Sequence, residues 1–565
     1  MISLQKRLTA ACLALALLFS LSACSASEEG GGASRGDVSQ SEPESSASAS
    51  GEDSSAGDPA ASEEKVLTYA VSSFPSTLDS AVTLNMFDAE ILYHTSEGLV
   101  RLCQNTVQPG IAERWEVDGL QYTFYLRDAV WEDGQPVTAD DFVYSFRRLL
   151  DPEINSSLVG GLLSVKNALA YRAGNAEASE LGIEAPDEKT LVITLESEAP
   201  YFLNMLASDS HAYPLRQDVV ETYGADYAMS AAAYLSCGPF RLQSWDEQAI
   251  TMVRNESYWD AGKVHLDRIV CALVPDGATR ALMFESGELN AYMEVLKSNE
   301  EHYTDAQSAC GNTLVSLQVN MGTEILADSD FRQALSSAID RQTLVSGVAI
   351  GGSEATDRFV SSIVPGKNGR YVDAFPLQNT ALSGDTAAAK GSLNTALDTL
   401  KLTADKLPEL RFVCQETATA VPVAEALVEY WKQVLGLTNI RLEILPAEEA
   451  VTRCREKEYD LYLQVNSAAY LDPYAHLSQW TSDAAYNWTN WADETYDTML
   501  KETSGIQDEA ERLQKLSECE QYLIDNGPQI PLYFRGYLYG CKENVTGISA
   551  SGAGVGLEMI YADLA

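Results

Sequence analysis

The sequence of 565 residues predicts an α/β protein that is built from at least two domains. A chain of this length exceeds what one hydrophobic core usually supports. Residues 121–150 predict a strand, a turn and a helix, and residues 410–445 predict two strands joined by a helix. A crossover helix between neighbouring strands makes the pair parallel, so at least one domain belongs to the α/β class.

The first 23 residues predict a secretion signal. Lys6 and Arg7 precede an apolar run, 13–21, that is shorter than a membrane-spanning helix. The run ends in Leu21-Ser22-Ala23-Cys24, which resembles the lipobox of bacterial lipoproteins. In this interpretation Cys24 is acylated and becomes the first residue of the mature chain. The alternative is an ordinary signal peptide with an incidental cysteine.

Residues 24–65 predict a disordered acidic linker behind the acylated cysteine. Between Ser25 and Glu64 the sequence is rich in Ser, Ala, Gly and acidic residues, and Arg35 is its only basic residue. Such a composition cannot bury enough apolar surface to fold. The whole chain has 82 acidic and 38 basic residues, a net charge of −44. This argues against nucleic acid as a partner, because such binding depends on Lys and Arg.

The strand and helix at residues 121–150 are the clearest local prediction. Alternating apolar residues predict a half-buried strand, and Asp133-Gly134 predicts the turn that ends it. Thr138 predicts the start of the helix, with Asp141 three residues later where the positive helix end favours an acid. One apolar face then predicts how the helix packs: Phe142, Val143, Phe146, Leu149 and Leu150.

The rest of the chain predicts further strands and helices. Strands are expected from residue 66 to a break at Pro75 and at 189–195, 240–245, 266–275, 313–320, 410–414, 440–444, 459–465 and 528–534. Helices are expected at 87–100, 278–287, 330–341, 424–435 and 510–523.

Several motifs, in order, resemble those of the extracytoplasmic solute-binding proteins, family 5, of ATP-driven importers. They include F-Y-L-R-D-A-V-W-E-D-G-Q-P-V-T-A-D-D-F-V at 124–143, P-G-I-A-E-R-W at 109–115, G-P-F with a later W at 238–245, N-E-S-Y-W at 255–259 and P-Q-I-P-L-Y at 528–533. The resemblance extends from about residue 66 to the C-terminus. That family includes oligopeptide-, dipeptide- and nickel-binding proteins.

The resemblance implies a two-lobe periplasmic-binding-protein-like fold of type II, in the large peptide-binder class with an extra subdomain in the first lobe. The expected divisions are 66–98, 234–312 and 533–565 for lobe I, 99–233 for its extra subdomain and 313–532 for lobe II. The implied partners are a short peptide or similar solute, an ABC permease and ATPase complex, and the membrane through the lipid anchor. A monomer without a cofactor is expected.

The resemblance also implies where a ligand binds. Peptide binders of the family meet the ligand's amino terminus with an Asp in a segment W-x-A-D-Y-x-D/E-P, and here Asn466 to Pro473 is the similar segment. Tyr470 and Asp472 match, whereas Asn466 replaces the Trp and Ala469 replaces the amine-binding Asp. A buried ammonium without a carboxylate loses a few kcal/mol. Therefore either another acid compensates or the ligand is not a peptide with a free amine.

Two further predictions concern these candidate ligand neighbours. Asp472 either turns inward as a substitute acid or caps the helix that follows it. Ser72, Ser73 and Phe74 follow the first strand, in a loop that lies near the cleft of the relatives; the alternative is a simple connection between a strand and a helix.

No enzyme motif is present in the sequence. It contains no H-E-x-x-H, G-x-S-x-G or G-x-x-x-x-G-K-[ST] pattern, and no two of its five histidines are four residues apart, so no metal site is expected. Apart from Cys12 and Cys24, eight cysteines remain, and disulfides or buried free thiols are both open for them.

The predicted function is therefore a substrate-binding lipoprotein of an ABC importer, held outside the cytoplasm on the cell surface or the periplasmic side. It is expected to capture short peptides in a cleft between two lobes. The alternatives are a binding protein for another solute, such as a metal chelate or a saccharide, and a surface receptor or scaffold without a transport role.

Overall fold

The computed structural model describes residues 64–565 apart from 83–85, 104, 155, 157–159, 210, 294–305, 379–380 and 551–555. The predicted signal peptide, Cys24 and nearly all of the predicted linker lie outside the described residues.

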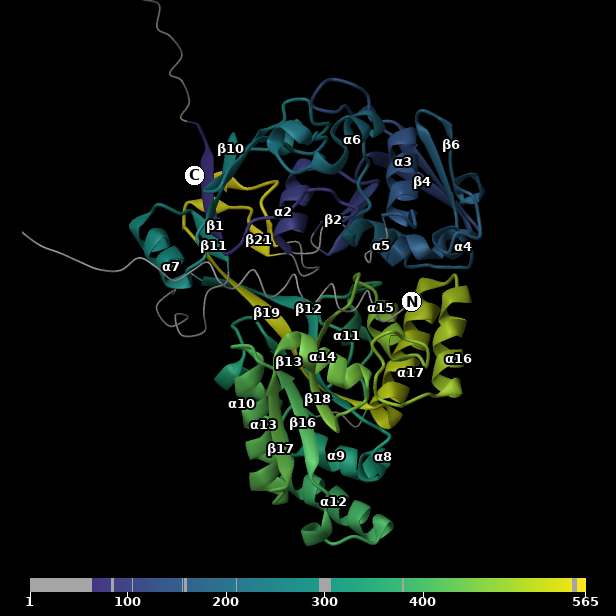
Figure 1. Ribbon diagram of the computed structural model, residues 1–565, viewed down its shortest axis with the longest axis vertical. Coiled ribbons are helices and arrows are strands. Elements are labelled where there is room, and N and C mark those ends of the chain that lie inside the picture. Colours follow the sequence, from purple (N-terminus) through teal and green to yellow (C-terminus); the bar gives the residue numbers. More distant parts are fainter. Residues whose placement is uncertain are drawn as a thin grey trace, which may run out of the picture. The chain divides into compact units, whose positions relative to one another are not determined.

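A mixed sheet of eleven strands runs through the described chain (Figure 1). Ten of them follow one another in the order β17 (Ile440–Leu445), β16 (Leu410–Gln415), β18 (Leu461–Ser467), β12 (Ala306–Val319), β19 (Gln529–Cys541), β11 (Ala291–Met293), β1 (Val66–Val71), β10 (Arg268–Leu273), β9 (Ala249–Arg254) and β8 (Phe240–Trp245). The eleventh, β13 (Glu354–Ala355), also pairs with β19.

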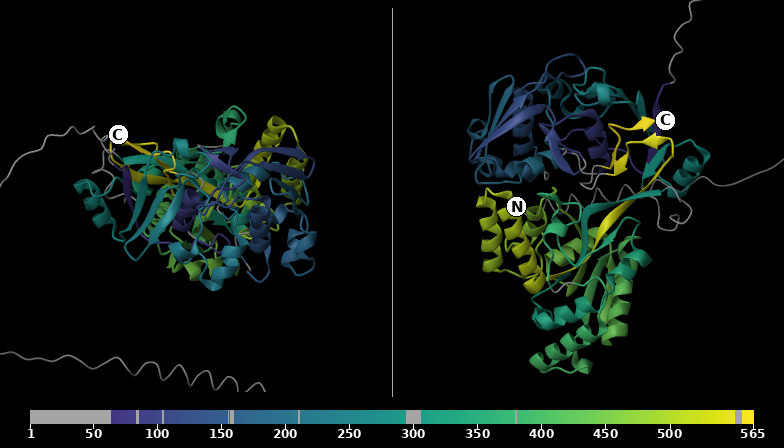
Figure 2. Two further views of the ribbon diagram at one scale, coloured as in Figure 1. Left: turned by 90° about the horizontal axis from the view of Figure 1, so that it is seen from above. Right: turned by 180° about the vertical axis from the view of Figure 1, so that it is seen from behind.

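Two long antiparallel strands, β12 and β19, connect the two halves of this sheet, and Figure 2 shows them side by side from behind. At one end β19 pairs with β11, where Ala291 lies opposite Cys541. At the other end Gln529 of β19 lies opposite Gln318 of β12. Each half has its own apolar core, one around β1 and β8–β10 and one around β16–β18. A bulge between Cys310 and Leu314 interrupts the pairing between these ends.

A separate antiparallel sheet is formed by β4 (Ala112–Asp118), β5 (Gln121–Leu126), β7 (Thr190–Thr194) and β6 (Ile183–Asp187). Helix α3 (Ala139–Leu150) packs on it through its buried apolar residues. The Asp141 carboxylate accepts the backbone N–H of Thr138 at 2.9 Å. This confirms the predicted helix start, because the carboxylate satisfies a donor at the first turn.

The predicted βαβ unit is confirmed in the second half of the large sheet. Strands β16 and β17 pair in parallel, with Leu410 opposite Ile440, and α13 (Ala420–Leu435) connects them. Gly436 ends this helix with a φ of +73°, in the left-handed region that glycine adopts without a steric penalty.

Two predicted helices have the wrong ends. Helix α2 (Met86–Thr95) stops before residue 100, because residues from Val100 onward pair as a hairpin of β2 (Val100–Cys103) and β3 (Thr106–Pro109). The helix expected at 330–341 is α9 (Ser329–Ser337), after which a second helix, α10 (Arg341–Val348), begins. Asp340 caps α10 by accepting from the Thr343 N–H at 2.9 Å, so the chain starts a new helix there.

The remaining helices and hairpins complete the described chain. The helices are α4 (Ala168–Arg172), α5 (Phe202–Ser208), α6 (Gln217–Tyr223), α7 (Gly277–Ser286), α8 (Glu324–Ala327), α11 (Tyr371–Ala374), α12 (Thr386–Leu400), α14 (Ala447–Arg455), α15 (Pro473–Leu477), α16 (Glu494–Glu502) and α17 (Glu509–Asn526). The hairpins pair β14 (Pro365–Gly366) with β15 (Gly369–Arg370), β20 (Val545–Thr546) with β23 (Asp563–Leu564), and β21 (Ser549–Ala550) with β22 (Leu557–Glu558).

The eight cysteines from Cys103 onward are free thiols, and six of them are buried. Of the two possibilities that the sequence leaves open, the structure therefore has the free thiols.

Candidate functional site

The candidate site is built on β18, whose last residues begin the segment Asn466–Pro473. Strand β18 pairs antiparallel with β12 along its whole length. Backbone bonds beyond both ends keep this register, with Ala468 N–H donating to Asn312 O at 3.3 Å and Asn320 N–H donating to Asp460 O at 2.9 Å. In an antiparallel pair, the backbone N–H and C=O groups of successive residues alternate between bonding to the partner strand and pointing to the opposite edge. The even-numbered residues of β18 therefore bond to β12.

The odd-numbered residues Val465 and Ser467 direct their backbone groups to the opposite edge of β18. Strand β16 lies on that side but pairs with β18 only at Leu461 and Tyr462. The Ser467 carbonyl accepts from the Gln479 side chain at 3.5 Å, a long bond. Within the described part of the chain, the edge at Val465 and Ser467 is thus open to another strand, and both residues are exposed.

A pocket opens beside this edge on one face of the large sheet. Val465, Val315 and Tyr533 are cross-strand neighbours there, on β18, β12 and β19. The end of α10 and the start of α13 form its other walls. Its complete lining is Val315, Val348, Ala349, Ile350, Thr419, Ala420, Leu463, Val465, Tyr533 and Arg535. The pocket is mostly apolar with a single charged side chain.

Ala469, where the resemblance led us to expect an amine-binding Asp, is exposed and has no charge. The neighbouring backbone is held from β12, where the Asn312 amide donates to the Ala468 carbonyl at 2.9 Å. Asn466 is half-buried, and its side-chain amide donates to that of Gln479. No side chain in this stretch offers a carboxylate until Asp472.

Asp472 is buried and already has partners. Its carboxylate accepts two hydrogen bonds from the Arg512 guanidinium, at 2.7 and 2.9 Å, and one from the Tyr474 N–H at 2.9 Å, which caps α15. Both Asp472 and Arg512 are 4% exposed. Burial alone would lower the pKa of Arg512, but the Asp472 carboxylate raises it above its usual value. A ligand ammonium would have to compete with Arg512 for this acid.

A cluster of tyrosine rings lies next to the ion pair. Tyr201, which precedes α5, stacks on Tyr470 and Tyr474 with ring centroids 5.3 and 4.6 Å apart. The Arg512 guanidinium lies 5.5 Å from the centre of the Tyr201 ring. Burial raises the pKa of Tyr201 and of Tyr470, so both phenols stay neutral. These rings join the segment to the core of the separate four-stranded sheet, in which Tyr470 is buried.

The three predicted residues after β1 are placed differently. Ser72 and Phe74 are half-buried and Ser73 is exposed, and Phe74 packs against the core around β1. Among the described residues, no hydrogen bond or ring contact joins these three to the segment Asn466–Pro473. Their predicted role as ligand neighbours stays a prediction.

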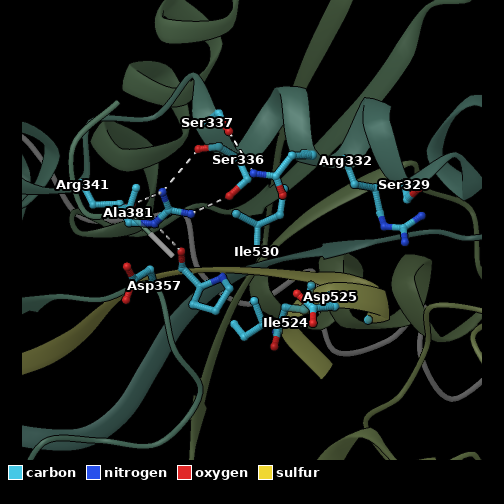
Figure 3. Close-up of a pocket in the computed structure, with 14 residues that line it drawn as sticks. Ser329, Arg332, Ser336, Ser337, Arg341, Asp357, Ala381, Ile524, Asp525 and Ile530 are labelled. Atoms are coloured by element: carbon cyan, nitrogen blue, oxygen red, sulfur yellow. Dashed lines mark hydrogen bonds between the residues drawn. The ribbon is translucent and has the colours of Figure 1, made fainter. Parts of the chain in front are cut away.

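A different cavity, shown in Figure 3, lies between α9, α10 and the start of β19. Arg341, 3% exposed, donates to the carbonyl of Pro531 and to the Ser336 hydroxyl, both at 2.8 Å. Arg332 donates to the carbonyls of Leu326 and Ala327. Burial lowers the pKa of Arg341 to about 10. These arginines satisfy backbone carbonyls, so we assign them to the structure of this half rather than to a ligand.

Three residues of the site were not predicted from the sequence: Tyr201, Arg512 and Arg535. The partners Asp472 and Arg512 are 40 positions apart, and no local pattern links them. Arg535 had a usable signal, because it interrupts the apolar run Ile530–Phe534. Among the described residues, no group of three or more His, Cys, Asp or Glu side chains could hold a metal ion.

The comparisons with known proteins agree on one family. The family model of bacterial extracellular solute-binding proteins, family 5, middle region, matches residues 106–488. The dipeptide-binding protein DppE of Bacillus subtilis is 27% identical over 96% of this chain and 96% of its own length. The probable deoxycholate-binding periplasmic protein YgiS of Escherichia coli is 28% identical over 86% of this chain and 90% of its own.

Among solved structures, the substrate-binding domain of an oligopeptide ABC transporter from Bacillus anthracis is 26% identical, with a TM-score of 0.70. The match covers 89% of this chain and 99% of that structure. Within the part of the chain that the structure describes, no helix has both the length and the apolar character needed to cross a membrane.

Proposed function

Because the chain belongs to family 5 of the bacterial extracellular solute-binding proteins, we propose that it binds short peptides for an ABC importer. Its fold is the two-lobe, type II periplasmic-binding-protein fold of the related structures. The observation that carries the proposal is the open edge of β18 at Val465 and Ser467. An extended peptide can pair with such an edge through its backbone, which gives affinity without selecting a sequence.

The side-chain environment supports the same ligand. The pocket beside Val465 is lined mostly by apolar residues and lies on the face of the sheet next to the open edge. Side chains of a strand alternate between the two faces, so a paired ligand would direct every second side chain towards this face. DppE and the Bacillus anthracis protein carry names that refer to dipeptides and oligopeptides, which adds weight to a peptide ligand.

In the proposed mechanism a ligand that contacts both lobes favours the closed state by its differential affinity, and the permease receives that state. Lobe I comprises 66–98, 234–312 and 533–565, with 99–233 as its extra subdomain, and lobe II comprises 313–532. The long strands β12 and β19 belong to both halves of the sheet, so they are the natural hinge. No catalytic step is part of this function.

The proposed location is outside the cytoplasm, as for the family, with Cys24 acylated and residues 24–65 acting as a flexible tether. The protein acts as a monomer with an ABC permease and ATPase complex. Mass spectrometry of the membrane-extracted protein would detect the acyl groups on Cys24. A mature protein without them would contradict the proposed anchor.

The direct test of function is native mass spectrometry of the purified protein with a pool of tri- to pentapeptides. We expect bound masses, and a rise in unfolding free energy of about 2.7 kcal/mol at a peptide concentration about 100 times the dissociation constant. No bound mass and no stabilisation would contradict the proposal.

A matched pair of variants tests the edge itself. Val465→Pro removes an N–H that faces away from β12, a position where a sheet tolerates proline. We expect it to weaken peptide binding about tenfold, the value of one good hydrogen bond. Val465→Ala keeps the N–H and should bind within about threefold of the wild type. Equal losses in both variants would argue against backbone pairing at this residue.

A second candidate is an apolar solute that is not a peptide. The similarity to YgiS, whose printed name refers to deoxycholate, favours this alternative, and so do the neutral Ala469 and the apolar pocket. If the peptide pool leaves the protein empty, deoxycholate is the compound to add next. If deoxycholate binds, the ligand class is a steroid acid and not a peptide.

A further inference from the structure

We propose that the pocket beside Val465 binds a carboxylate of the ligand through Arg535, and that this contact, rather than one to the ligand's amine, selects the ligand by charge. This inference rests on the proposed function and names the chemistry of the ligand end that enters the pocket.

Arg535 lies at the mouth of an apolar pocket. It follows Tyr533 by two residues on β19, so both side chains belong to the same face of the sheet as their neighbours Val315 and Val465. All four residues line the pocket. A guanidinium at the rim of an apolar pocket attracts an anion into surroundings with less water, where charge-assisted hydrogen bonds are strong.

Arg535 has no acidic partner in the part of the chain that the structure describes. Its side chain is exposed, and among the described residues no carboxylate lies within ion-pair distance and no acceptor takes a hydrogen bond from its guanidinium. By contrast, Arg512 is paired with Asp472 and Arg358 with Glu520. In a chain with a net charge of −44, an arginine without an acid at a pocket is available for a ligand.

The segment Asn466–Pro473, which begins at the end of β18, offers no free carboxylate for a ligand cation. Ala469 is neutral and exposed, and the Asp472 carboxylate is held by both terminal nitrogens of Arg512 and by the Tyr474 N–H. Within the segment Asn466–Pro473, a free ammonium would therefore meet no unpaired acid. Consequently the ligand's carboxylate gives the main charge contact, and blocking its amine should matter little.

The carboxylate has two possible sources, an acidic side chain and the C-terminus of the peptide. Both are planar anions that match the fork of a guanidinium. Arg535 would bind a carboxylate from either source. A set of peptides that differ by one modification each can separate the two sources.

The experiment is calorimetric titration of the purified protein with one pentapeptide that contains a single Glu. Four forms are compared: unmodified, N-acetylated, C-amidated and with Gln in place of Glu. In the wild type we expect N-acetylation to change affinity less than threefold. Amidation or the Gln exchange, whichever removes the bound carboxylate, should weaken binding about 10- to 100-fold, as for hydrogen bonds to charged groups.

Two variants complete the test. Arg535→Gln should weaken binding of the unmodified peptide to the same extent and should no longer distinguish the charged from the neutral form. Arg455→Gln makes the same charge change at an exposed arginine that ends α14 and lies outside the pocket, and it should bind like the wild type. Because Arg535 is exposed and has no ion-pair partner among residues 64–565 as described, the Arg535→Gln variant should unfold at the same temperature as the wild type.

The outcomes separate the two proposals. If the wild type binds the peptides but Arg535→Gln still distinguishes charged from neutral forms, the carboxylate site is wrong and the peptide-binding function stands. If N-acetylation is the modification that abolishes binding, an amine site exists and the inference is overturned. If no form of the peptide binds to the wild type, both the function and the inference fail.

Discussion

Two charged regions lie beside the open edge of β18, and they differ in whether their charges have partners. In the first, Asp472 and Arg512 are buried and satisfy each other. In the second, Arg535 is exposed beside an apolar pocket and has no acidic partner among the described residues. The difference separates structure from recognition: a satisfied buried pair holds the segment in place, whereas an unpaired cation is free for a ligand. The two regions should therefore respond differently to the same kind of mutation.

The largest expected effect is on stability, in the first region. Arg512→Met leaves the Asp472 carboxylate buried without its partner, which costs about 3–5 kcal/mol of unfolding free energy. Urea denaturation measures this loss. Arg535→Gln is the matched control and should change stability by less than about 0.5 kcal/mol, because an exposed side chain without partners contributes little. Similar losses in both variants would remove the contrast between the regions.

A pH effect also belongs to the first region, through His476. This histidine is buried in α15 against Phe534, and burial lowers its pKa to about 3. Since the unfolded chain takes up a proton near pH 6.5, stability should fall as pH decreases from 6.5 towards 3. Between pH 6.5 and 5, His476 should lower the unfolding free energy by about 2 kcal/mol, because each pH unit contributes about 1.4 kcal/mol.

The variant His476→Gln isolates this contribution. Its unfolding free energy should fall less between pH 6.5 and 5 than that of the wild type, by about the same 2 kcal/mol. Equal pH slopes in the two proteins would show that His476 takes up its proton in the folded state. The second region should not respond in this range, because a guanidinium stays charged.

A smaller effect is expected from the tyrosine cluster. Tyr201→Ala removes two stacked ring pairs, each worth about 1 kcal/mol, and so should cost about 1–2 kcal/mol. Tyr201→Phe keeps both ring contacts and serves as the control in thermal unfolding. If the Phe variant were as unstable as the Ala variant, the stabilisation would come from the Tyr201 hydroxyl and not from the ring contacts.

The smallest expected effect is a gain at Ala469. Ala469→Asp places a carboxylate where the resemblance to the family implies one, on an exposed residue, where ion pairs contribute at most about 1 kcal/mol. A peptide with a free amine should bind about fivefold tighter to this variant, whereas its N-acetylated form should not. Parallel titrations of the two peptides measure the ratio. An unchanged ratio would mean that the ligand's amine lies elsewhere.

Local patterns in the sequence predicted many elements of the fold. The alternation and turn of 121–150 and the βαβ unit of 410–445 appear in the structure as β5, α3, β16, α13 and β17. The errors are at helix ends. Val100 continues the apolar pattern of α2 but pairs in a hairpin with Pro109 instead, so tertiary pairing overrides the local pattern.

The candidate site was only partly predictable. The segment Asn466–Pro473 was identified by its resemblance, and the missing acid at Ala469 was visible in the sequence itself. The ion pair of Asp472 was not, because its partner lies 40 residues away on another helix. The open edge of β18 also depends on where β16 stops pairing, which no pattern within β18 encodes. Contacts between distant residues therefore decide which of the candidate residues are free for a ligand.

The most direct test of the account is hydrogen exchange at the backbone amides of Val465 and Ser467, with and without a bound peptide. Both N–H groups face the open edge, so they should exchange readily in the free protein and slow markedly when a peptide pairs with β18. The even-numbered amides, already bonded to β12, should change little. A peptide that binds without slowing exchange at Val465 and Ser467 would contradict the account.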